Sequence, residues 1–286
     1  MQKTFQKRMK RLLIGLLIFV GIIVFCYFEN NAITVSQYEI ASEKIPESFD
    51  GFVIVHLSDL HNKMFGENQK RLIKHVKEQN PDMIVITGDL IDSNRPDVGT
   101  GLLLAEEAMK IAPVYFVTGN HDNYLSDTDT FALFHGMERL GARVLEDEAI
   151  ELYMENEQEC ISLMGVDDDT IAYNSQLAET LEELVAREDE GSLFTVLLAH
   201  EPQRMPTYSK YDIDLVLSGH AHGGQFRIPF VGGFVAPDQG FLPKYTKGLY
   251  EENGTKMIVS AGLGNSVIPQ RLLNRPEVVK ITLNSK

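Results

Sequence analysis

The chain has 286 residues, of which 44% are hydrophobic and 23% charged, a composition typical of a folded globular protein. Disordered and repeat proteins are excluded, because no low-complexity run or internal repeat is present. The formal net charge is −15, and no Lys/Arg-rich stretch follows the first eleven residues, so no nucleic-acid partner is expected.

The N-terminal segment combines a basic tail with an uncharged apolar run. Residues 1–11 carry five basic side chains and no acid, and residues 12–28 carry no charge at all. A run of this length is at the short end of what spans a bilayer as a helix. A signal peptide is the alternative, but the sequence Phe25-Cys26-Tyr27-Phe28 lacks the small residues of a cleavage site. We therefore expect a cytoplasmic tail (1–11), a transmembrane anchor (12–28), a connector (29–48) and a catalytic domain (49–286).

The orientation of this anchor follows from the charge of its flanks. Basic residues stay on the cytoplasmic side of a membrane. We therefore expect a single-pass protein of the cell membrane whose catalytic domain lies on the extracytoplasmic side.

Short runs rich in Val and Ile alternate with helical patterns in the first half of the domain, which predicts an α/β fold. Later strands follow one another without helices, which predicts mixed sheets. Residues 226–250 are rich in Gly, Pro and aromatic residues and receive no firm assignment. The expected strands are 52–57, 83–87, 114–118, 143–145, 150–154, 161–166, 193–199, 215–218 and 257–260, and the expected helices are 69–79, 102–111, 130–140 and 175–187.

Polar residues stand directly after five of the expected strands. In open α/β sheets, loops at the carboxyl ends of strands form the ligand crevice, so these residues are expected to meet in space. The five motifs are Asp59-Leu60-His61, Gly88-Asp89-Leu90-Ile91-Asp92, Gly119-Asn120-His121-Asp122, His200 and Gly219-His220-Ala221-His222.

The donor types in these motifs favour a borderline transition metal. Mg²⁺ and Ca²⁺ prefer all-oxygen shells, whereas a mixture of imidazole, carboxylate and amide suits Zn²⁺, Mn²⁺ or Fe. Two such ions about 3.5–4 Å apart can share a hydroxide and clamp both oxygens of an in-line displacement, which is chemistry suited to phosphate esters.

The five motifs, in this order, resemble those of the calcineurin-like metallophosphoesterase superfamily. The tail Gly262-Leu263-Gly264-Asn265-Ser266, with Pro269 and Arg271, is similar to its membrane-anchored bacterial branch, which includes YkuE-like and YaeI-like phosphodiesterases and resembles UDP-2,3-diacylglucosamine hydrolases. The resemblance implies a four-layer α/β/β/α sandwich of two mixed sheets. It also implies two metal sites, with Asp59, His61 and His222 on one, Asn120, His200 and His220 on the other, and Asp89 bridging them.

The same resemblance gives His121 the role of assisting the leaving group and Asp122 that of orienting His121. Asp92 matches the motif without an evident chemical role. The expected activity is hydrolysis of a phosphodiester or phosphomonoester on a small molecule or lipid, associated with the membrane or envelope. A metal-binding sensor or scaffold without turnover and a nuclease remain as alternatives, and the sequence leaves the substrate, the native metals and the oligomeric state open.

Overall fold

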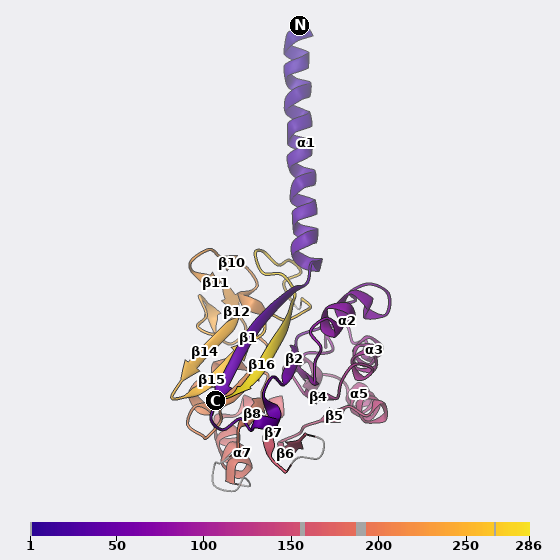
Figure 1. Ribbon diagram of the computed structural model, residues 1–286. Helices are drawn as coiled ribbons and strands as arrows, with labels where there is room; N and C mark the ends of the chain where they lie inside the picture. The colour runs from indigo at the N-terminus through magenta and orange to yellow at the C-terminus, as the bar shows by residue number, and fades with distance from the viewer. Residues whose placement is uncertain (1, 155–157, 187–192, 266) are drawn as a thin grey trace.

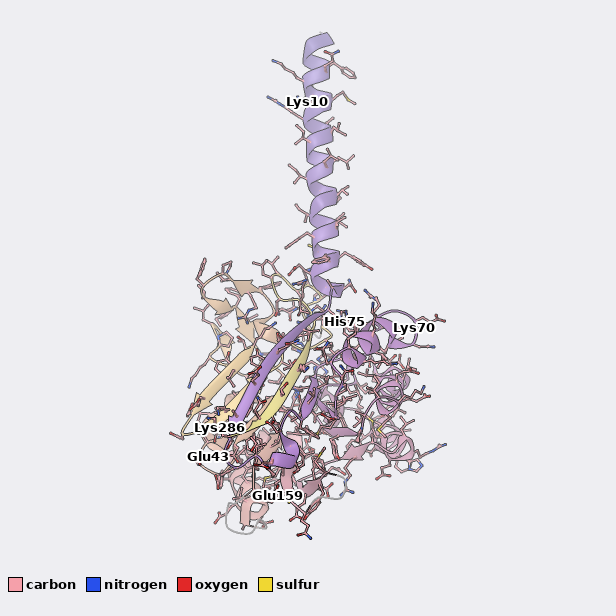
Figure 2. All side chains as sticks on the ribbon, viewed as in Figure 1. Lys10, Glu43, Lys70, His75, Glu159 and Lys286 are labelled. Atoms are coloured by element: carbon pink, nitrogen blue, oxygen red, sulfur yellow. The ribbon has the colours of Figure 1, made fainter. Side chains whose placement is uncertain are left out.

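The computed structural model describes residues 2–154, 158–186, 193–265 and 267–286. Helix α1 (Gln2–Asn31) projects away from the globular part, and its side chains stand free along most of its length (Figures 1 and 2). The segment Phe5–Asn31 is long and apolar enough to cross a membrane, and only 6% of its most apolar window is buried.

The globular part contains two six-stranded mixed sheets. In the first sheet, β2, β3, β4 and β5 run parallel, β16 is antiparallel to β2, and β1 is parallel to β16. Its strands, in order across the sheet, are β1 (Thr34–Ser42), β16 (Glu277–Ser285), β2 (Val53–Leu57), β3 (Met83–Thr87), β4 (Val114–Val117) and β5 (Arg143–Val144).

The second sheet has a parallel centre with an antiparallel strand at each edge. Its order is β14 (Gly248–Glu252), β15 (Thr255–Val259), β9 (Leu215–Ser218), β8 (Thr195–Leu198), β7 (Cys160–Gly165) and β6 (Glu148–Tyr153).

Three apolar clusters define the layers. The inner faces of the two sheets pack together through side chains such as Val85 and Leu217. Helices α2 (Lys70–Lys77), α3 (Val98–Met109) and α5 (Asp127–Leu140) cover the outer face of the first sheet, and α7 (Asn174–Ala186) and α8 (Met205–Tyr208) cover that of the second. The layers are therefore helices, sheet, sheet and helices, which confirms the expected α/β/β/α sandwich. Each sheet buries one face against the other sheet and the other face against helices.

The segment 29–48, expected to be a connector, contains β1, the edge strand of the first sheet. Strand β16, at the C-terminus, was not anticipated either, and the two strands pair with each other from Thr34–Glu277 to Ser42–Ser285. Residue 187, the last residue of the expected helix 175–187, lies outside the described residues. The segment 226–250 contains four short strands, β10 (Arg227–Ile228), β11 (Gly232–Gly233), β12 (Val235–Ala236) and β13 (Gly240–Phe241), before β14 begins.

Candidate metal centre

Loops after β2, β3, β4, β8 and β9 bring all seven expected metal ligands together. The donor atoms of Asp59, His61, Asp89 and His222 lie within 4.8 Å of one another, and those of Asp89, His200 and His220 form a second such group. Asn120 joins the second group, because its Oδ1 lies 3.0 Å from Nδ1 of His220. Asp89 therefore belongs to both groups, in the arrangement that the sequence analysis expected, while the role of these side chains as metal ligands stays a prediction.

The proton positions on His200 and His220 leave lone pairs that face other acceptors. Nδ1 of His200 donates to the carbonyl oxygen of Thr87 at 2.8 Å, so Nε2 is the atom that carries the lone pair when the ring is neutral, and this Nε2 lies 3.3 Å from Oδ2 of Asp89. His220 donates from Nε2 to Asp238 at 2.9 Å, which turns the Nδ1 lone pair toward Asn120. Acceptors this close repel each other unless a positive charge lies between them.

Buried polar atoms without hydrogen bonds point to the same conclusion. Among the described side chains, Oδ2 of Asp59 and Nε2 of His200 are buried and make no hydrogen bond. A buried polar atom without a partner costs about 1–3 kcal/mol. Because both atoms belong to the two donor groups, the residues fit a pair of metal ions.

The pKa values of His61, His222 and Asp89 favour the forms that bind metal, whereas that of His200 favours the charged ring. Burial lowers the pKa of His61, and burial together with His61 and Arg271 lowers that of His222 well below its usual value, so both rings are neutral. Burial would raise the pKa of Asp89, but the charge of the neighbouring His200 ring holds it well below its usual value. Asp89 in turn holds the pKa of His200 well above its usual value despite burial, so His200 must release a proton to bind a cation. Neutral imidazole and ionised carboxylate are the forms that bind cations.

The backbone is strained at most of the expected metal ligands. Five of the seven residues have left-handed φ values, an arrangement that costs a non-glycine residue roughly 1–2 kcal/mol and that clusters at functional sites. These residues are Asp59 (φ 51°), His61 (46°), Asp89 (52°), His220 (63°) and His222 (47°).

Two glycines of the motifs lie where neighbouring loops leave no room for a Cβ atom. A Cβ atom at Gly219 would lie 1.8 Å from Oγ of Ser58 and 2.5 Å from Oδ2 of Asp59. At Gly88, a Cβ atom would lie 2.6 Å from the Gly119 backbone and from His200, and the φ of 78° is itself left-handed. These loops therefore approach each other too closely for any side chain.

His121 is oriented by Ser93, which the sequence analysis did not identify. The backbone N–H of Ser93 donates to Nδ1 of His121 at 3.2 Å, and Oγ of Ser93 lies 2.9 Å from the same atom. Since an N–H only donates, Nδ1 is the acceptor and the proton of the neutral ring is on Nε2. The family resemblance implied that Asp122 orients this ring, but the Asp122 carboxylate instead accepts hydrogen bonds from the amides of Leu90, Ile91 and Gly119.

Asp122 and Asp92 therefore hold loops. Asp122 ties the loop after β3 to the loop after β4, and burial, with the nearby charge of Asp89, raises its pKa to about 7. Asp92 accepts hydrogen bonds from Asn94 and Arg95 in its own loop, with Oδ1 3.6 Å from Nδ1 of His121. A loop-supporting role for Asp92 agrees with its place in the motif.

Arg271, which the sequence places in the tail that resembles the membrane-anchored branch, supports the site through its hydrogen bonds. Its guanidinium is fully buried and donates to the carbonyl oxygens of Ala261, Gly264 and Asn274. The loop held in this way packs against Asp59, since the N–H of Gly264 donates to its carbonyl oxygen. Arg271 therefore shapes the loop beside the site and has no free donor face for substrate.

A cavity of about 460 Å³ opens over the donor groups. Asp89, Asn120, His121, His220 and His222 form its polar floor. Its rim is largely apolar, and none of the described lining residues is Lys or Arg. The rim consists of Tyr124, Gln225, Val235, Ala236, Pro237, Asp238, Val267 and Ile268.

This fold and this pair of donor groups define a metal-dependent phosphoesterase, and residues 52–224 match the calcineurin-like phosphoesterase family, to which the chain belongs. The chain is 32% identical to the uncharacterized metallophosphoesterase YkuE of Bacillus subtilis, over 91% of this chain and 88% of that protein. An uncharacterized metallophosphoesterase of Aquifex aeolicus is 30% identical, over 94% and 99% of the two chains. A transmembrane protein with metallophosphoesterase domain from Danio rerio is 34% identical over 87% of this chain, which spans 57% of that relative.

Proposed function

We propose that the chain hydrolyses phosphodiesters or phosphomonoesters at a two-metal site held by the seven donors described above. The observation that carries this proposal is the position of Asp89, whose carboxylate belongs to both donor groups. Mn²⁺, Zn²⁺ and Fe suit the mixed nitrogen and oxygen donors. When bound, such a pair of ions lowers the pKa of water and offsets the charge of the phosphate.

The protein side chains supply orientation and a proton. His121 lines the cavity and has its Nδ1 occupied by Ser93, so the Nε2 proton is available to the leaving oxygen of the ester. Asp238 holds the ring of His220, in the manner of the carboxylates that orient metal-bound histidines. The apolar rim favours a substrate whose leaving group carries an apolar part.

We further propose that α1 is a retained anchor, with the domain outside the cytoplasm and a substrate in the membrane or envelope. The last turn of α1 supports retention, because Glu29 is 5% exposed and accepts a hydrogen bond from the backbone of Asn274. A cleaved signal sequence would leave this contact unmade. The basic residues before the apolar run support the orientation.

The activity is tested with full-length protein in detergent, stripped of metal and reloaded with Mn²⁺, Zn²⁺ or Fe²⁺. Bis(p-nitrophenyl) phosphate and p-nitrophenyl phosphate serve as diester and monoester probes. We expect turnover of at least one probe only after reloading, with little turnover by His121→Asn protein that binds the same metal. Metal-loaded wild-type protein that turns over neither probe would contradict the proposal.

The orientation is tested on intact cells with Tyr173→Cys protein, because Tyr173 is exposed. A membrane-impermeant maleimide should label this cysteine and spare the buried Cys160 of wild-type protein. Labelling only after cell lysis would place the domain in the cytoplasm.

A further inference from the structure

We infer that the domain also contacts the bilayer directly, through apolar loops around the base of α1. This inference rests on the anchor proposed above. The loops are the β10–β11 hairpin and the segment 267–273 between β15 and β16. Their exposed apolar side chains, here called the bilayer-contact surface, are Ile228, Phe230, Val231, Val267, Leu272 and Leu273.

The junction between α1 and the domain sets the depth of this surface. Nε2 of Gln270 donates to the carbonyl oxygen of Cys26 at 3.2 Å, so the loop contacts the last turn of the apolar run itself. Cys26 precedes the end of the helix by about 8 Å at a rise of 1.5 Å per residue. A loop at this height cannot lie far below the membrane surface. Further hydrogen bonds run from Asn30 Nδ2 to the Pro269 carbonyl at 2.9 Å and from the Arg271 N–H to Asn30 Oδ1 at 2.8 Å.

The hairpin is fixed to the same loop. Phe226 and Leu272 form a parallel bridge, in which the N–H of Arg227 donates to the Leu272 carbonyl at 2.9 Å. Phe230 and Leu273 line one groove of about 400 Å³. In Figure 1, β10 and β11 lie at the end of the domain from which α1 emerges. The hairpin, the loop and α1 therefore form one continuous face.

The chemistry of this face fits a lipid surface. The hairpin tip is Pro229-Phe230-Val231, where Phe230 is fully exposed and has a φ of 66°. Turn tips in water are normally polar, whereas Phe and Leu beside basic residues are typical of segments that lie in the bilayer interface. Arg275 supplies such a charge, with its guanidinium 5.4 Å from the ring centroid of Phe28 on α1.

The position of this face affects access to the metal centre. Val267 belongs to the bilayer-contact surface and also lines the cavity over the metal donors, as does Ile268 beside it. One wall of the cavity therefore begins at the membrane. A phosphate ester in the headgroup layer can enter along this wall, which favours an amphiphilic substrate resident in the membrane.

The chain contains no tryptophan, so single tryptophans report on this contact without background. Full-length Phe230→Trp protein is reconstituted in phosphatidylcholine vesicles with and without dibrominated acyl chains. Tyr153→Trp is the matched exposed control, because Tyr153 pairs with Cys160 at the end of β7 far from the metal loops. Phe19→Trp, within α1, reports on the anchor itself.

We expect brominated lipid to remove at least about half of the emission of Phe230→Trp and of Phe19→Trp, and to leave that of Tyr153→Trp unchanged. Quenching of Phe19→Trp alone would overturn the bilayer-contact surface and leave the anchor intact. A blue-shifted Phe230→Trp that brominated lipid does not quench would also overturn it, because a second copy or another protein would then cover the hairpin. An unquenched Phe19→Trp would overturn the anchor and the surface together, without bearing on the metal chemistry.

Discussion

Nε2 of His200 and Oδ2 of Asp89 lie 3.3 Å apart, and both side chains are buried at the junction of two loops. The two side chains come from opposite sheets of the sandwich, after β8 and after β3. A cation between them would neutralise one carboxylate and satisfy one imidazole lone pair at once. The packing of the two loops against each other is therefore stabilised when a cation lies between these two atoms.

Replacement of His121 tests its role as the proton donor. His121→Asn should lower kcat roughly 10²- to 10⁴-fold, the usual contribution of a general acid, and leave the metal content unchanged. Ser93→Ala removes one of the two contacts to Nδ1 but keeps the backbone N–H, so its loss should be smaller, about 10-fold or less. The measurement is steady-state kinetics with bis(p-nitrophenyl) phosphate at saturating metal. Equal kcat values for His121→Asn and wild type would remove His121 from the mechanism.

Asp238→Asn tests the support of His220. The substitution weakens the hydrogen bond that holds Nδ1 toward Asn120, so the affinity for one metal ion should fall about 10- to 100-fold. Competition with a fluorescent chelator measures this affinity. Asp212→Asn, at an exposed ion pair with Lys44, is the matched control and should bind metal as the wild type does. Unchanged affinity in Asp238→Asn would show that Asp238 does not position the ring.

Gly219→Ala tests the close approach of the loops after β2 and β9. The new methyl group would overlap Ser58 and Asp59, so the free energy of unfolding should fall by about 1–3 kcal/mol and metal should be lost. Gly99→Ala is the control, because its Cβ atom in α3 meets only the end of the Asp97 side chain at 3.3 Å. This control should be neutral or slightly more stable, since alanine favours helix. Urea unfolding of the two variants compares them directly, and equal midpoints would contradict the crowded geometry.

Arg271→Met tests the loop beside Asp59. It keeps much of the side-chain volume but leaves several buried carbonyl oxygens without donors, so the loss of stability should exceed about 2 kcal/mol. Arg139→Met, on the exposed face of α5, should change stability by less than about 0.5 kcal/mol. Thermal unfolding in detergent measures the loss of stability in each of the two variants. A tolerated Arg271→Met would show that the loop is held by other contacts.

The sequence predicts the centre of each sheet best. The expected bounds of β3 and β9 agree with the structure at both ends, because each is a short apolar run closed by Gly-Asp or Gly-His. Strands β1 and β16 were not anticipated, since they pair across more than two hundred residues, and the half-exposed positions of the edge strand β1 mimic a connector. Periodicity within a short window carries no signal for such a partner.

The sequence also predicts one part of the site and leaves another part unpredicted. The seven donors follow buried strands in motifs, so the sequence alone brings them to one edge of the fold. Ser93, Asp238 and the buried Arg271 contact the site through loops without regular pattern, and only the three-dimensional arrangement identifies their partners. For Asp122, the family resemblance implied a contact with His121, whereas the short helix α4 (Asn120–Asn123) turns its carboxylate toward the amides of the neighbouring loop.

The central claim is that two metal ions share the carboxylate of Asp89, and elemental analysis of full-length protein tests it most directly. Wild-type protein purified without chelator and loaded with Mn²⁺, Zn²⁺ or Fe²⁺ should retain two ions per chain after dialysis, and Asp89→Asn protein should retain fewer, with activity falling in parallel. The control His135→Asn, on the exposed face of α5, should keep both ions. Folded wild-type protein that cleaves phosphate esters with less than one ion per chain would contradict the account.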